Sequence, residues 1–168
     1  MSAPNIHSTQ FDGVRVRAES DKPYDELVAA LFADIGSTPV PINDFPSASQ
    51  TWEDYQHKVE PHVGPSGFML FAAFDHGGWL PTAGVNRKAL RVILGNPLIA
   101  ITMIRHDVTA ALFAPVEILV LDEPDNRSSV TYIRPSSLMV TEENPPLLDA
   151  ARALDAKLDA LVAKVVTP

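Results

Sequence analysis

The segments with strand character lie together in the middle of the chain, and most of the helical periodicity lies outside them. Apolar or alternating residues predict strands at 68–74, 89–94, 116–121 and 129–134, after an opening strand at 10–17. This order favours an α+β fold over a doubly wound parallel sheet. We therefore expect an antiparallel sheet of about four to five strands with helices packed on one face.

Apart from a short helix at 49–59, two helices are expected before the last one. The first follows the opening strand, where Ser20 or Asp21 would cap it, and Gly36 would stop it. The second, at 97–105, would begin at Asn96, because asparagine is a good N-cap and the proline that follows suits the first helical turn. After the last strand, the sequence favours a loop and not a catalytic serine turn at 135–137, because no G-x-S-x-G elbow is present.

The chain closes with its clearest helix. Asn144 would cap this helix, and two prolines would occupy its first turn. Its apolar residues alternate in steps of four and three, which is typical of a helix laid across a sheet but also resembles a short coiled-coil seam. The stripe consists of Leu147, Ala151, Leu154, Leu158, Leu161 and Val165.

The segment 36–66 is the least regular part of a chain that otherwise has the size of one domain, 1–168. Prolines interrupt it repeatedly. Between them, 49–59 is predicted as a short helix, with Trp52, Tyr55 and Val59 on its inner face together with Gln56. We interpret 36–66 as an insertion between the first helix and the second strand.

Charge and composition limit the classes of partner and the kinds of site that we expect for this chain. Its formal net charge is −8, which repels nucleic acid and anionic lipid, so neither is expected as a partner. It contains no cysteine, which excludes disulfides, thiolate metal sites and a cysteine nucleophile. No signal-like or membrane-spanning apolar run is present, so we expect a cytoplasmic location, and no motif indicates a cofactor or metal.

Four stretches carry a family resemblance. They read FMLFAAFDH at 68–76, RVILGNP at 91–97, LFAPVEILVLDE at 112–123 and VTYIRPSSLM at 130–139. In order and spacing they resemble the family known as domain of unknown function 302. The resemblance implies a TATA-binding-protein-like fold, with the order strand, helix, four strands, helix. It implies no established activity, and a shared fold does not carry DNA binding with it.

Asp75 and His76 are the first candidate site residues. A carboxylate and an imidazole at a strand end, beside two glycines, are in a common place for function, and they match an Asp-His pair of the family that the chain resembles. A purely structural interpretation stays open, because neighbouring strand residues point to opposite faces and an aspartate can simply cap a turn.

Four further candidates flank the short helix at 97–105. Asn96 begins it, where free backbone N–H groups can hold an anion. Arg105, His106 and Asp107 end it, although the helix dipole alone explains two cations there and Asp107 would cap the following turn. On a neighbouring strand, Glu117 is expected to face outward or to pair with an arginine, Arg91 or Arg134.

Three hypotheses for function follow. The first is a non-enzymatic module that binds a small apolar or weakly anionic ligand between the sheet and the helices, with Asp75, His76 and Arg105 as polar anchors. The second is a hydrolytic or acid-base enzyme that uses His76 or His106 with a nearby carboxylate. The third is self-association as a homodimer, through the terminal stripe and the apolar residues Trp79, Leu80 and Phe113.

Overall fold

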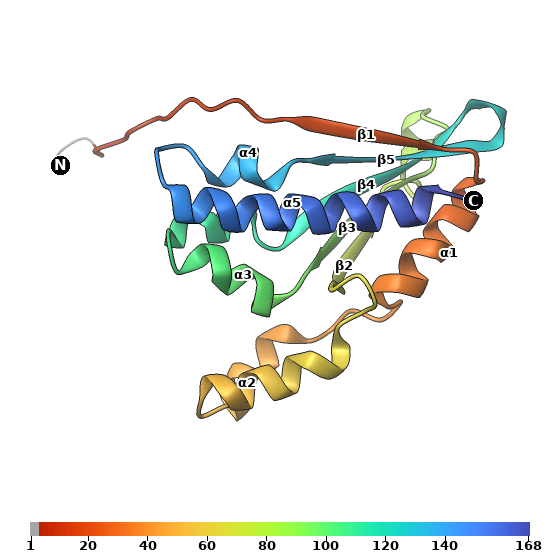
Figure 1. The fold of residues 1–168 in the computed structure, drawn as a ribbon. Helices are drawn as coiled ribbons and strands as arrows, with labels where there is room; N and C mark the ends of the chain where they lie inside the picture. Colours follow the sequence, from red (N-terminus) through yellow and green to blue (C-terminus); the bar gives the residue numbers. More distant parts are fainter. Residues whose placement is uncertain (1–3) are drawn as a thin grey trace.

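The core of the molecule is a five-stranded antiparallel sheet, described in a computed structural model that covers residues 4–168. The strands lie in the order β1-β5-β4-β3-β2 (Figure 1). This confirms the predicted α+β class and the antiparallel sheet. The strand bounds are β1 (Arg15–Ser20), β2 (Met69–Asp75), β3 (Ala89–Gly95), β4 (Val116–Glu123) and β5 (Arg127–Ile133).

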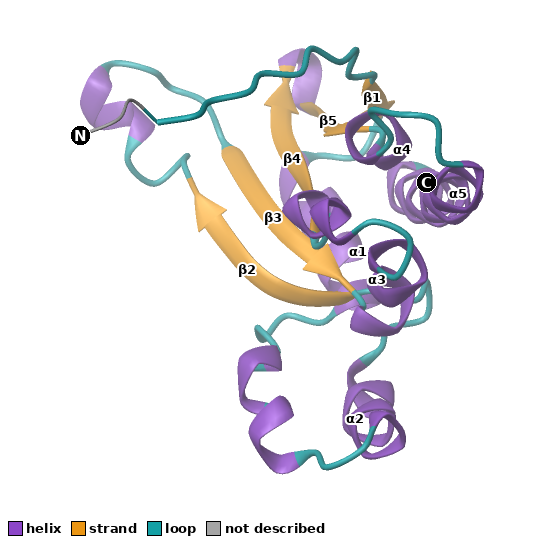
Figure 2. Ribbon diagram, turned by 90° about the vertical axis from the view of Figure 1, so that its left-hand side faces the viewer, coloured by secondary structure: helices purple, strands orange, loops and turns teal. Residues whose placement is uncertain are grey.

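The helices cover one face of this sheet. Figure 2 shows α1, α3, α4 and α5 gathered on one side of the strands, as the sequence predicts, while α2 projects away from them. The long helix α5 runs along the sheet (Figure 1). The helix bounds are α1 (Tyr24–Ile35), α2 (Trp52–Val59), α3 (Pro97–Ile104), α4 (Pro135–Met139) and α5 (Pro145–Val166).

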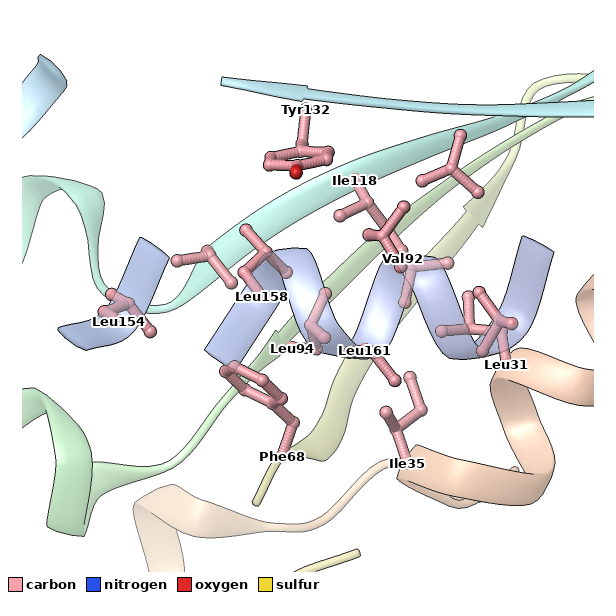
Figure 3. Packing of buried hydrophobic residues seen from close by; sticks show 14 of the residues in the cluster. Leu31, Ile35, Phe68, Val92, Leu94, Ile118, Tyr132, Leu154, Leu158 and Leu161 are labelled. Atoms are coloured by element: carbon pink, nitrogen blue, oxygen red, sulfur yellow. The ribbon is translucent and has the colours of Figure 1, made fainter. Parts of the chain in front are cut away.

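The hydrophobic core lies between α5, α1 and the inner face of the sheet. All six residues of the predicted α5 stripe are buried in it, so the stripe is not available for self-association. Leu158 and Leu161 reach toward Val92 and Ile118 of the sheet, as Figure 3 shows. Burial of one such leucine contributes about 1.5–3 kcal/mol, which accounts for the regularity of the stripe.

The pairing of β1 with β5 explains where the first strand begins. Arg15 lies opposite Ile133, the last residue of β5, so the residues before Arg15 have no strand to pair with. The strand is therefore Arg15–Ser20 and not 10–17 as predicted. The next helix is not capped by Ser20 or Asp21, because its N-cap is Pro23, without a side-chain cap bond. The hydroxyl of Ser20 instead donates to the carbonyl of Val166 at the end of α5, and the carboxylate of Asp21 accepts from Arg127.

Three other expectations are corrected by the structure. The run 68–74 is continuously apolar, which is typical of a strand covered on both faces or lying in mid-sheet, but β2 is an edge strand and its Phe74 is 50% exposed. α2 buries only Val59, and its Trp52 is 46% exposed, because the helix projects from the domain. Residues 135–139 form a short helix where a loop was expected, because Asp155 accepts from the backbone N–H of Ser136.

No helix within residues 4–168 is both long and apolar enough to cross a membrane.

Candidate functional site

Asp75 and His76 lie in the turn that follows β2. The Oδ1 of Asp75 accepts from the N–H of Gly78 at 3.1 Å, so the carboxylate caps the turn. The Nδ1 of His76 accepts from the indole nitrogen of Trp79 at 3.3 Å, and the two rings lie edge to face. Within residues 4–168 no histidine forms an ion pair with a carboxylate. The two side chains therefore do not form an acid-base pair.

Asn96 lies at the other end of the same strand pair. Met69 is opposite Gly95 and Asp75 is opposite Leu90, so the Asn96 end and the Asp75 end of the sheet are separated by the length of the strands. The Oδ1 of Asn96 accepts from Leu98 N–H at 2.9 Å, which confirms its predicted cap of α3. Its Nδ2 donates to the carbonyl of Gly67 at 3.0 Å. Both ends of this side chain are thus used within the fold.

Arg105, His106 and Asp107 follow the end of α3. The Nε of Arg105 donates to the Ile101 carbonyl, one turn back in the helix. The carbonyl of His106 accepts from the side chain of Asn144, at the start of α5. The carboxylate of Asp107 accepts from Thr109, both its hydroxyl at 2.7 Å and its N–H at 2.8 Å, and these bonds lower the pKa of Asp107. The predicted capping role of Asp107 is confirmed.

The structure does not gather the six predicted residues into one site. His76 lies beside the first residue of β3, because its N–H donates to the Ala89 carbonyl. His106 follows α3, which begins beyond the last residue of β3. The structure therefore does not bring the two histidines together, and within residues 4–168 neither forms an ion pair with a carboxylate. Within residues 4–168, no cluster of three or more histidine, aspartate or glutamate side chains is suited to hold a metal ion.

An apolar cavity lies beside α3, and its lining residues were not predicted from the sequence, apart from Asn96. It has a volume of about 160 Å³ and lies between α3 and the ends of β2 and β3. Ile99, Ala100 and Met103 of α3 form one wall, and Phe71 lies on the sheet side. Ile42, from the segment 36–66, lines it as well.

The wall of this cavity is almost entirely apolar. Among its described lining residues, Asn96 is the one with a polar side chain, and that side chain is already paired at both ends. A β carbon on Gly95 would come within 3.0 Å of the ring of Phe71, so glycine lets this ring close against the strand end. The described wall of the cavity therefore offers apolar contact, and none of its side chains is an acid or a base.

One sequence signal pointed toward this cavity. The helix α3 reads PLIAITMI and is apolar on every side, which is typical of a fully buried helix. In the structure only Met103 is buried, and the other helix residues that line the cavity are half-buried. The apolar side chains of α3 that the rest of the fold leaves partly uncovered therefore form an open wall of the cavity.

Comparisons with known proteins identify a family and a related structure. The model of the family described as Domain of unknown function DUF302 matches residues 44–165. The chain is similar to the crystal structure of an uncharacterized conserved protein DUF302 from Bacillus stearothermophilus, with 13% sequence identity and a TM-score of 0.62. This similarity covers 90% of the present chain and 97% of the other. None of the curated proteins compared with the chain matches it.

Proposed function

We propose that this chain, which belongs to the family described as Domain of unknown function DUF302, is a binding module that holds a small apolar group beside α3. The observation that carries the proposal is the apolar cavity of about 160 Å³. Apolar cavities of about this size, at 150 Å³, stay dry and bind benzene or xenon. The ligand is a molecule of roughly benzene size, or the apolar end of a longer one.

The chemistry of the wall supports simple binding. The Oδ1 and Nδ2 of Asn96 each already form a hydrogen bond within the fold, and the other side chains of the wall are apolar, so a polar ligand would recover little of its lost hydration. An apolar ligand pays no such cost, and it covers the half-buried Ile99 and Ala100. For six non-hydrogen atoms at about 0.7 kcal/mol each, the expected Kd is about 1 mM.

The test is a titration with benzene, followed by NMR of the methyl groups. Saturable shifts are expected at Ile99, Met103 and Leu154, which line the cavity. Ala100→Phe fills the cavity and should abolish these shifts, while Ala160→Phe adds the same ring on an exposed position of α5 and should leave them unchanged. Absence of saturable shifts in the wild type, or equal binding by Ala100→Phe, would overturn the proposal.

A second variant keeps the proposal testable if Ala100→Phe fails to fold. Met103 is buried and lines the cavity, so Met103→Ala enlarges it. The enlarged cavity should bind a bulkier probe, naphthalene, more tightly than the wild type does. If naphthalene binds both proteins equally, the cavity is not the binding site.

Self-association stays a second proposal, through Trp79, which belongs to the surface first expected, and without the terminal stripe. With the α5 stripe buried, the proposed contact consists of Phe74 and Trp79, two exposed apolar side chains near the end of the edge strand β2. They are 50% and 53% exposed. Light scattering at high concentration should report a homodimer that Trp79→Ala weakens, and a monomer for the wild type would remove the proposal.

A further inference from the structure

The face of the sheet without helices carries a wide hollow of about 680 Å³. Ile118 and Val120 of β4 point into the core, so the alternating residues Leu119 and Leu121 point to the opposite face. Both are half-buried and line the hollow together with Thr131 of β5. The hollow thus has an apolar floor and a volume within the usual range for ligand sites.

Arginines stand on both sides of this floor. The strand register places Arg17 opposite Thr131, Thr131 opposite Leu119, and Leu119 opposite Arg91. One row across the sheet therefore reads arginine, threonine, leucine, arginine. Arg91 also lies over the ring of Phe74, 5.9 Å from its centroid, on the next strand.

Charged side chains surround the apolar floor of the hollow. Four guanidinium groups and two carboxylates line it, and two more carboxylates, those of Glu19 and Asp122, pair with Arg17 and Arg87. The arrangement of the ion pairs therefore decides where an anion can bind.

The ion pairs identify which cation has its charge available. Glu117 pairs with Arg91. Arg17 pairs with Glu19 at 3.1 Å and with Glu123 at 2.8 Å. Arg87 pairs with Asp122 at 2.8 Å and with Glu123 at 3.7 Å. Arg15 is exposed and takes part in no ion pair or side-chain hydrogen bond within residues 4–168. Its neighbour across the strands is the half-buried Ile133. An available guanidinium thus stands beside apolar surface.

We infer that this hollow binds a small amphipathic anion, with a carboxylate-type group at Arg15 and an apolar body over Leu119, Leu121 and Ile133. A planar guanidinium matches a carboxylate with two parallel hydrogen bonds, which fixes the anionic end. The apolar body of the ligand covers the leucine and isoleucine side chains of the floor and removes its own apolar surface from water. This site shares no lining residue with the cavity beside α3, so either site can fail without the other.

The probe for this site is 2-naphthoate, at low salt, with binding followed by NMR of leucine and isoleucine methyl groups. Shifts are expected at Leu119, Leu121 and Ile133, and added sodium chloride should weaken them because exposed charges are screened. The neutral 2-naphthalenemethanol, with the same rings, should bind about tenfold more weakly. Equal binding of the two compounds would overturn the inference.

A matched pair of variants separates a local effect from a change in net charge. Arg15→Glu should weaken 2-naphthoate binding about tenfold or more. Arg105→Glu changes the net charge by the same amount at an exposed residue that does not line the hollow, and should leave the affinity within about twofold. Equal loss in both variants, or none in Arg15→Glu, would overturn the inference.

Two further outcomes complete the test. Arg15→Gln removes the charge without reversing it, and it serves if Arg15→Glu fails to fold; it should still weaken binding several-fold. A short single-stranded oligonucleotide is the remaining anionic probe. If it binds at the hollow while 2-naphthoate does not, the site recognises a polyanion and the inference is wrong.

Discussion

The ammonium nitrogen of Lys164 lies 2.6 Å from the Oδ2 of Asp34, and this contact joins the last turn of α5 to the last turn of α1. Asp34 is buried and also accepts from Ser66, both its N–H at 3.2 Å and its hydroxyl at 2.7 Å. Burial alone would raise the pKa of Asp34, but the bonds from Lys164 and Ser66 outweigh it and lower that pKa. The charged carboxylate therefore holds three parts of the chain together.

Loss of this carboxylate should destabilise the fold strongly. Asp34→Ala leaves Lys164 and the N–H of Ser66 without their acceptor, and we expect the free energy of unfolding to fall by about 3 kcal/mol. Lys164→Met should cost only about 1 kcal/mol, because Lys164 is 57% exposed and solvent screens the pair. Urea unfolding measures both. The control is Lys157→Met, at an exposed position of the same helix; an Asp34→Ala protein as stable as this control would contradict the prediction.

The lowered pKa of Asp34 also predicts how stability depends on pH. The unfolded chain binds a proton at this carboxylate near pH 4, and the folded chain does so at a lower pH. The stabilisation is therefore fully present above about pH 4 and is lost as the pH falls through the folded pKa. The free energy of unfolding of the wild type should fall more steeply below pH 4 than that of Asp34→Asn. Parallel pH profiles for the two proteins would show that Asp34 does not carry this dependence.

Asn96 should act on stability through two separable bonds. Asn96→Ala removes the cap of α3 and the bond to Gly67, and is expected to cost about 2 kcal/mol. Asn96→Asp keeps an oxygen acceptor for the cap and loses only the donor, so it should cost about 1 kcal/mol. Thermal or urea unfolding ranks the three proteins. Benzene binding in the Asn96→Asp protein should persist, and its loss would mean that Asn96 takes part in binding.

The sequence predicted the parts of the fold that depend on local patterns. The cap at Asn144 and the six-residue stripe of α5 follow from helical spacing and cap chemistry, and both are present. Glu117 was expected to pair with Arg91 or Arg134, and the pair with Arg91 is present, because the two residues lie on neighbouring strands of one face.

The remaining features depend on contacts between segments that are distant in the sequence. The helix α4 forms because Asp155, nineteen residues later, accepts from the N–H of Ser136, and its sequence carries no sign of that partner. The cavity beside α3 depends on how Ile42 and Phe71 meet that helix. The hollow on the face without helices appears only when β1 joins β5 and places Arg15 and Arg17 on the same face as Arg91. Local periodicity in the sequence predicts helices and strands, but the pairing of strands decides which side chains lie on the same face of the sheet.

Gly64 provides the sharpest test of packing in the segment 36–66. A β carbon at this position would lie 1.9 Å from the backbone carbonyl oxygen of Asp34, which no side-chain rotation can relieve. Gly64→Ala must therefore displace the loop from the end of α1, and it should lower the free energy of unfolding by about 3 kcal/mol. Gly13→Ala is the matched control, because its β carbon meets Ile133 at an ordinary 3.7 Å and should change stability by less than about 0.5 kcal/mol. If urea unfolding gives both variants the same stability, the loop does not contact α1 as closely as the structure describes.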